Sequence, residues 1–147
     1  MSEPNHIEYR TGNADLDLEA VIELYRRSTL GERRPVGTRS IMQAMIENAD
    51  LVITAWDGTR LIGISRTLTD YQYVAYLADL AVDVAWQGKG IGRRLIELTR
   101  EALAPTCFIT LLAAPNANDY YPKAGFVHNP RAWMLPAQEA AQPDPTD

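Results

Sequence analysis

The stretch that decides the fold is YLADLAVDVAWQGKGIGRRLIEL, which runs from Tyr76 to Leu98. Residues 76–82 are apolar or aromatic apart from Asp79, which is typical of a buried strand. In the second half the apolar side chains recur every three or four positions, as on one face of a helix. The stretch therefore predicts a strand, a glycine-rich turn and a helix, in that order.

The turn, Gln87-Gly88-Lys89-Gly90-Ile91-Gly92, has the composition of an anion-binding loop. At a helix N-terminus the unpaired backbone N–H groups and the positive end of the helix dipole point at one spot. Glycines reach backbone angles that other residues avoid, and without a Cβ they let an anion approach the amides. We therefore expect this turn to hold phosphate.

Three phosphate-binding patterns compete for this turn, and their spacing separates them. The Walker pattern fails because Asp83 stands where its first glycine belongs and Gly90 where Ser or Thr belongs. The dinucleotide fingerprint fails because Arg93 replaces its third glycine and because the motif follows more than half of the chain. The third pattern, Gln/Arg-x-x-Gly-x-Gly/Ala, is met by Gln87, Gly90 and Gly92.

In this third pattern the sequence resembles the GCN5-related N-acetyltransferase (GNAT) superfamily, in which the loop binds the pyrophosphate of acetyl-CoA. A second match lies downstream, because residues 120–126, YYPKAGF, resemble the family's late aromatic-Tyr-x-Lys-x-Gly-Phe motif. Residues 111–116 also resemble the end of the family's fifth strand. Together with the order of elements, the resemblance covers residues 6–135.

Composition limits the class of protein. A chain of 147 residues that is 46% apolar is expected to form one domain with a real core. No apolar run reaches the ~18 residues of a membrane span, and the N-terminus lacks a signal-peptide pattern, so we predict a soluble cytoplasmic protein. The single cysteine, Cys107, excludes an internal disulfide and a cysteine-based metal site. A net charge of −5 argues against nucleic acid as a partner.

Periodicity and turn residues predict the elements in chain order. Strands are expected over residues 6–10, 51–56, 61–68, 76–82 and 107–112, with two closing strands over 126–128 and 132–135. Helices are expected after caps at Asp15 or Asp17 and at Thr38, from Ile91, and over residues 117–124.

The fold class that follows, with the resemblance, is α/β (α+β). The GNAT fold implies a mixed, mostly antiparallel sheet of six to seven strands, flanked by about four helices and split between strands 4 and 5. We expect an acetyltransferase domain over residues 1–135 and a disordered, proline-rich acidic tail over residues 136–147.

The resemblance implies that acetyl-CoA is the cosubstrate. No metal is expected, because His6 and His128 stand apart from any candidate ligand. In the family the pantetheine arm pairs with the exposed edge of the split sheet like an extra strand. The positions that make this contact are matched by Leu80, Ala81 and Val82. The remaining cofactor-binding residues that the resemblance implies are Gln87, Gly88, Lys89, Gly90, Ile91, Gly92 and Arg93 around the pyrophosphate, and Asn116 at the pantetheine or adenosine end.

Two residues are candidates for catalysis. Tyr121 matches the family's general acid, whose phenol points at the sulfur of the leaving group, although packing in a short helix is the alternative. Asp79 is the one ionisable residue in the apolar strand 73–82, which makes it a candidate general base. Family members often place a glutamate on this strand, sometimes one residue away, where this chain has Ala78, so the alternative that Asp79 pairs with a neighbouring strand or helix stays open.

The function implied is transfer of an acetyl group from acetyl-CoA to a primary amine of a small molecule or peptide, by direct attack in a ternary complex. Two alternatives stay open: a non-catalytic acyl-CoA-binding or sensing module, and an acetyltransferase with a macromolecular acceptor. Homodimers are common in such folds, and the sequence leaves this open.

The acceptor site is expected to form from residues 29–38 and 69–73, but the sequence does not identify the acceptor. Arginines in the first segment and just after it could receive an anionic group, namely Arg33, Arg34 and Arg39. Aromatic residues that could wall the pocket are Trp56, Tyr71, Tyr73 and Trp86.

Overall fold

A single sheet is the centre of the structure, a computed structural model that describes residues 6–146. Its strands lie in the order β1-β2-β3-β4-β5, with β1 to β4 antiparallel to their neighbours and β5 parallel to β4. The strands are β1 (Glu8–Thr11), β2 (Leu51–Asp57), β3 (Arg60–Thr69), β4 (Val74–Val82) and β5 (Phe108–Thr110). The helices are α1 (Leu18–Arg27), α2 (Arg39–Glu47), α3 (Ile91–Glu101) and α4 (Tyr120–Lys123), with 3₁₀ turns η2 (Leu30–Arg33) and η3 (Val84–Trp86).

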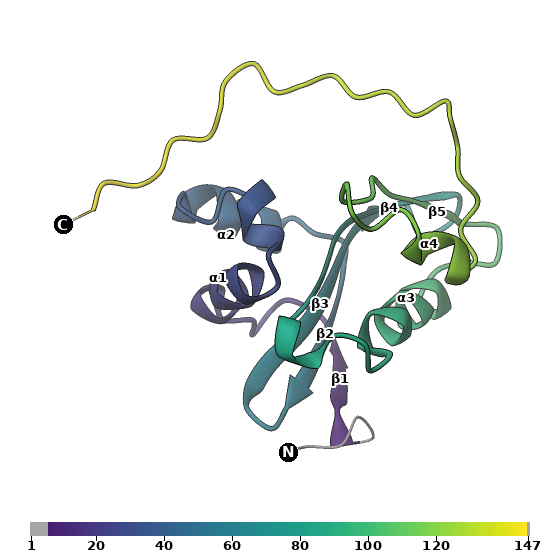
Figure 1. Cartoon of the computed structure of the whole chain (residues 1–147), viewed down its shortest axis with the longest axis horizontal. Coiled ribbons are helices and arrows are strands. Elements are labelled where there is room, and N and C mark those ends of the chain that lie inside the picture. The colour runs from purple at the N-terminus through teal and green to yellow at the C-terminus, as the bar shows by residue number, and fades with distance from the viewer. Residues whose placement is uncertain (1–5, 147) are drawn as a thin grey trace.

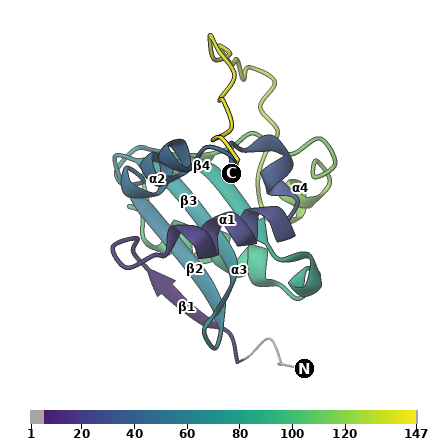
Figure 2. The same cartoon turned by 90° about the vertical axis from the view of Figure 1, so that its left-hand side faces the viewer.

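The sheet separates two layers of helices (Figure 1, Figure 2). On one face, Leu24 and Tyr25 of α1 and Met42 of α2 are completely buried against the strands. On the other face Leu95 of α3 is equally buried. These residues lie on the apolar faces that helical periodicity predicts, and this burial is the main contribution to the stability of each layer.

The split between the fourth and fifth strands is present. β4 and β5 pair only over Val74–Tyr76 and Phe108–Thr110. Beyond Tyr76, β4 continues to Val82 with β3 as its partner in the described part of the chain. The backbone of residues 77–82 therefore presents an open edge towards the segment that follows β5.

The two closing strands predicted over residues 126–128 and 132–135 are wrong, and the described residues form a sheet of five strands rather than six or seven. The side chains of Val127, Trp133 and Leu135 are more than 90% exposed. Pro130 cannot donate to a ladder, and side chains that remain in water gain nothing from strand pairing. A composition typical of strands therefore does not lead to strands here, because no partner strand within the described residues buries these side chains. β5 and α4 are also shorter than predicted.

Residues 136–146 form an exposed chain without helix or strand, which runs from the α4 side of the molecule back to α2 (Figure 1). There the Thr38 hydroxyl donates to the Gln142 carbonyl at 2.6 Å, and the Asp144 carboxylate accepts from the Arg39 N–H at 2.9 Å. A disordered tail that begins at residue 136 remains a prediction. None of the helices within residues 6–146 combines the length and the apolar character that crossing a membrane requires.

Candidate active site

A cavity of about 1100 Å³ lies along the open edge of β4. It is lined by β4, by the turn that leads into α3, and by the segment between β5 and α4. Nearly all residues assigned to the site from the sequence line it, namely Asp79, Leu80, Ala81, Val82, Gln87, Gly88, Gly90, Ile91, Gly92, Arg93, Asn116 and Tyr121. Lys89 is the exception, since its exposed side chain lies outside the lining.

The glycine-rich turn leaves a row of backbone donors free at one end of this cavity. Gly88 and Gly90 have φ angles of 78° and 85°, in the left-handed region that favours glycine. The first hydrogen bond of α3 runs from the Arg94 N–H to the Gly90 carbonyl at 3.0 Å. Within the described residues, none of the N–H groups of residues 88–93 donates to a protein acceptor. With the helix dipole behind them, these donors form an anion-binding nest.

Two side chains that come before the glycines fix the chain between β4 and the turn. Gln87 donates from its side-chain amide to the Val82 carbonyl at 3.0 Å. Asp83 is buried and accepts from the Ala85 N–H at 3.0 Å and from the Arg27 guanidinium at 2.7 Å. Burial raises the pKa of Asp83, but these two bonds outweigh it and hold that pKa below its usual value. The negative charge of this carboxylate is therefore offset by its own partners, which weakens its repulsion of an anion in the nest.

Asp79 lies at the other end of the cavity and is 1% exposed. Its carboxylate accepts from the Arg66 guanidinium at 2.5 Å, the Arg34 guanidinium at 2.6 Å and the Tyr25 hydroxyl at 2.6 Å. Burial raises the pKa of Asp79, but Arg66, then Tyr25 and Arg34, hold it below the usual value. A carboxylate with both oxygens occupied and a lowered pKa is a poor proton acceptor, so this geometry favours the pairing alternative over a general base.

A β-bulge in β4 leaves a backbone carbonyl for Arg34. Arg66 of β3 is in register with Asp79, but the next pair is Thr67 with Leu77, so Ala78 has no register partner on β3. The Ala78 carbonyl instead accepts from the Arg34 guanidinium at 2.9 Å. Bulges are common beside active sites because they redirect side chains and free backbone groups.

Sequence reasoning missed Arg66 and Tyr25 as partners of Asp79. A signal for Arg66 was available, because it is the one charged residue in the apolar strand predicted over residues 61–68, and a short turn near residues 70–72 joins that strand to the strand that carries Asp79. No local pattern indicated Tyr25, which reaches Asp79 across 54 residues of sequence.

Of the predicted acceptor-site residues, Arg33, Arg34 and Trp86 line the cavity. Arg39 instead pairs with Glu19 at the start of α2. The other aromatic side chains lie elsewhere: Trp56 stacks under the Arg10 guanidinium, Tyr71 donates to the Asp50 carbonyl and Tyr73 packs on Phe108. The segment 69–73 does not contribute to the lining.

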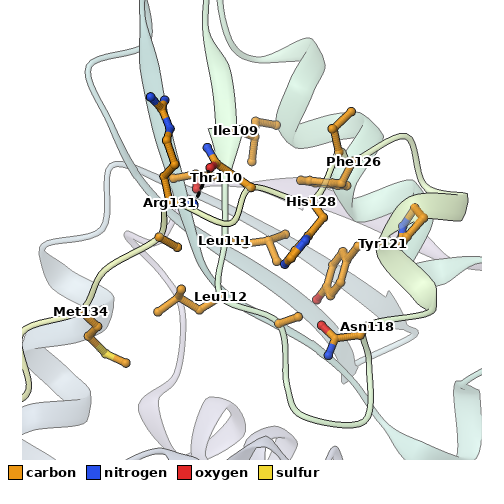
Figure 3. A pocket seen from close by; sticks show the side chains of 15 residues that line it. Ile109, Thr110, Leu111, Leu112, Asn118, Tyr121, Phe126, His128, Arg131 and Met134 are labelled. Atoms are coloured by element: carbon orange, nitrogen blue, oxygen red, sulfur yellow. Dashed lines mark hydrogen bonds between the residues drawn. The ribbon is translucent and has the colours of Figure 1, made fainter.

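Tyr121 lies where the cavity meets a second hollow of about 1000 Å³, which Leu111, Leu112, Asn118 and His128 also line (Figure 3). Its ring packs edge-to-face on Tyr120 and Phe126, with centroids 5.2 and 5.5 Å away. Burial, and to a smaller degree Tyr120, raises the pKa of Tyr121. The phenol therefore keeps its proton at neutral pH and can act as a hydrogen-bond donor.

Comparison with known proteins identifies the family of this chain. The Acetyltransferase (GNAT) domain family matches residues 14–132. The uncharacterized N-acetyltransferase ycf52 of Porphyra purpurea is 33% identical over 95 residues, which are 62% of this chain and 50% of that protein. The chain thus spans about half the length of this curated relative.

Solved structures show the same fold. The GNAT family protein SP0256 of Streptococcus pneumoniae matches with a TM-score of 0.74 at 20% identity, over 90% of this chain and 99% of that one. The aminoglycoside N-acetyltransferase AAC(6')-Iy, solved in complex with CoA, matches with a TM-score of 0.69 at 16% identity, over 90% and 95%. The chain therefore belongs to the GNAT acetyltransferase family.

Proposed function

We propose that this chain transfers the acetyl group of acetyl-CoA to a primary amine of a small molecule or peptide, by direct attack within a ternary complex. The observation that carries the proposal is the free row of N–H groups from residue 88 to 93, which shares one cavity with the open edge of β4 and with Tyr121. The CoA complex of a protein with the same fold supports it.

In the proposed complex the pyrophosphate of acetyl-CoA binds the nest, where backbone N–H groups supply the hydrogen bonds and Arg93 adds charge. The pantetheine arm runs along the open edge and pairs with the backbone of Leu80–Val82 as an added strand. Asn116, which lines the cavity in the segment that follows β5, is proposed to hydrogen-bond the pantetheine or adenosine part of the cosubstrate. This arrangement points the thioester towards Tyr121 on one side and Arg34 on the other.

The reaction proposed is attack of the amine nitrogen on the thioester carbon, followed by cleavage of the C–S bond. The Tyr121 hydroxyl donates a hydrogen bond to the departing thiolate. Full proton transfer from an ordinary phenol to an ordinary thiolate is uphill by roughly 2 kcal/mol, and the raised pKa of Tyr121 makes it harder still. We therefore assign Tyr121 the stabilisation of the thiolate by hydrogen bonding. The proton that converts the thiolate to the thiol comes from the attacking nitrogen, which is positively charged after attack and becomes a neutral amide when it loses that proton, directly or through water.

The amine must be neutral to attack. For an amine with a lysine-like pKa this costs roughly 4.6 kcal/mol at pH 7. Asp79 is badly suited to take that proton, because Tyr25, Arg34 and Arg66 occupy its oxygens. We assign Asp79 a positioning role, in which it fixes Arg34 at the acceptor end, and we propose that a water molecule removes the proton.

The test combines binding with turnover. Acetyl-CoA should raise the melting temperature, and Gly90→Glu should abolish that rise by placing a carboxylate where the pyrophosphate binds. Gly58→Glu is the matched control, because Gly58 has a similar φ of 62°, equally open surroundings and a place in the distant β2–β3 hairpin. A free-thiol assay across amines, amino acids, polyamines and peptides then measures transfer.

The outcomes separate the remaining alternatives. A thermal shift without thiol release from any amine would leave an acyl-CoA-binding module and end the enzymatic proposal. If acetyl-CoA gave no thermal shift, the nest would not be its binding site. Turnover of a small amine would exclude the need for a macromolecular acceptor. A cytoplasmic location and a homodimer stay predictions.

A further inference from the structure

The acceptor end of the cavity carries an unusual balance of charge. Among the described residues, the ionisable acids and bases other than tyrosine that line the cavity are Arg33, Arg34, Arg66, Arg93 and Asp79. Arg93 belongs to the cofactor end, because it lies in the first turn of α3. The acceptor end therefore holds three guanidinium groups and one carboxylate.

The single carboxylate does not neutralise this end. Asp79 is fully buried, and its oxygens already accept from Arg34, Arg66 and Tyr25. One negative charge between two positive charges leaves the group with a net positive charge. Arg33 adds another, because its exposed side chain pairs with no carboxylate within residues 6–146. A protonated amine or a polycation would meet repulsion here.

Arg34 is built to bind an oxyanion. Three of its five N–H groups have protein acceptors: Nε–H bonds the Asp79 carboxylate, and one N–H of each terminal nitrogen bonds the carbonyls of Ala78 and Arg33. One N–H on each terminal nitrogen is left without an acceptor in the described chain. The guanidinium is thus fixed at three points while each terminal nitrogen keeps one donor for a ligand, and guanidinium donors of this kind bind carboxylates and phosphates.

We propose that the acceptor is an amine that carries an oxyanion, a carboxylate or a phosphate, and that Arg33 and Arg34 bind this group. The inference rests on the proposed acetyl transfer and specifies its substrate class. Such an acceptor would differ in charge from the aminoglycosides, the polycations for which some proteins of the same fold are named. The same positive charge also favours the neutral form of the amine, which assists a site in which Asp79 is a poor base.

The experiment compares matched acceptors by the free-thiol assay with acetyl-CoA. One pair is 4-aminobutanoate against 4-aminobutanamide, and the second is 2-aminoethyl phosphate against 2-aminoethanol. A polycationic acceptor, 1,4-diaminobutane, is tested beside the two pairs. All rates are corrected for the fraction of each acceptor whose amine is neutral. We expect kcat/KM to be at least about tenfold higher for the anionic member of one or both pairs, and lowest for the diamine. The pair with the larger ratio identifies the oxyanion as carboxylate or phosphate.

Arg33→Gln tests the assignment of the site, because its exposed side chain can be replaced without disturbing the buried group. It should lower the ratio of anionic to neutral kcat/KM severalfold, and Arg33→Glu should lower it further. Arg39→Gln is the control, since Arg39 is equally exposed but lies outside the cavity and pairs with Glu19. Arg39→Gln should leave the ratio at its wild-type value.

Different results would overturn the proposed acceptor class and the proposed acetyl transfer. Equal or better turnover of the neutral amines or the diamine overturns the inference while acetyl transfer stands. An unchanged ratio in both Arg33 variants overturns the role of Arg33 and with it the oxyanion site. No thiol release from any amine, in a protein that still shows a thermal shift with acetyl-CoA, overturns the proposed function and this inference together.

Discussion

The two ends of the cavity are built in opposite ways. The proposed cofactor end offers backbone N–H groups from the consecutive residues 88–93, to which Arg93 adds a charge. The acceptor end uses the side chains of Tyr25, Arg34, Arg66 and Asp79, which come from four separate parts of the chain. A backbone site tolerates loss of a side chain but not a wrong φ angle or a bulky intruder, whereas a side-chain site depends on every partner. We therefore expect substitutions at the two ends to have effects of different size.

The largest effect is expected for Asp79→Asn. The substitution leaves two guanidinium groups around a neutral amide, and breaking a buried ion pair in this way costs about 3 kcal/mol. Urea unfolding at pH 7 measures the free energy of unfolding. Asp119→Asn is the control, because Asp119 is exposed and caps no N–H with its side chain, and it should cost less than about 0.5 kcal/mol. Equal losses in both variants would contradict the buried network.

The pH dependence of stability sharpens the same point. The pKa of Asp79 is lower in the folded protein than its ordinary value of 3.8, so the unfolded chain takes up the proton more readily. The stabilisation from Asp79 is therefore complete above that value and is lost as the pH falls through the folded-state pKa. The difference in unfolding free energy between wild type and Asp79→Asn should be constant from pH 5 to 7 and shrink below about pH 4. A difference that changes between pH 5 and 7 would indicate a raised pKa, as a general base requires.

An intermediate effect is expected where the two ends meet, at Tyr121. Tyr121→Phe keeps the ring packing on Tyr120 and Phe126 but removes the hydroxyl, so kcat should fall by about 10- to 100-fold. The affinity for CoA should change by less than about twofold, since the nest is untouched. Tyr73→Phe, outside the cavity, serves as the control. A variant with wild-type kcat would take Tyr121 out of the mechanism.

The smallest effect is expected for Lys89→Gln. Lys89 lies within the nest sequence, but its side chain is exposed and outside the cavity lining. Removing its charge should weaken CoA binding by only about two- to threefold, and added salt should reduce the difference further. Isothermal titration with CoA checks this. A loss of affinity as large as that of Gly90→Glu would show that the cofactor end depends on side chains after all.

The same contrast explains what the sequence could predict. The nest is contiguous, so its glycines and the change from strand to helical period identified it without any tertiary contact. The core faces of the helices followed from periodicity for the same reason. The acceptor end could not be assembled from the sequence, because it requires Tyr25 to meet Asp79 and requires the bulge at Ala78, whose carbonyl binds Arg34. Long-range pairing of that kind leaves no local pattern.

The closing strands failed for a related reason. Residues 126–127 and 132–135 are apolar or aromatic, but a strand is stabilised by its neighbour, and Val127, Trp133 and Leu135 remain in solvent. Asp79 illustrates the intermediate case. The sequence singled it out as a buried charge that needs a role or a partner, and the partner Arg66 lies directly across the strand pair. The need for a partner could be predicted from the sequence, but the number of partners could not.

The central claim is that the backbone amides of residues 88–93 hold the pyrophosphate. The most direct measurement is a titration of the ¹⁵N-labelled protein with CoA, followed through the ¹H–¹⁵N chemical shifts of the backbone amides. The account predicts that the amide protons of Gly88, Gly90 and Gly92 move downfield together as they form hydrogen bonds to phosphate, with saturation at one equivalent, while those of the Gly58 hairpin stay in place. Saturable binding that leaves these three amides unmoved would contradict it.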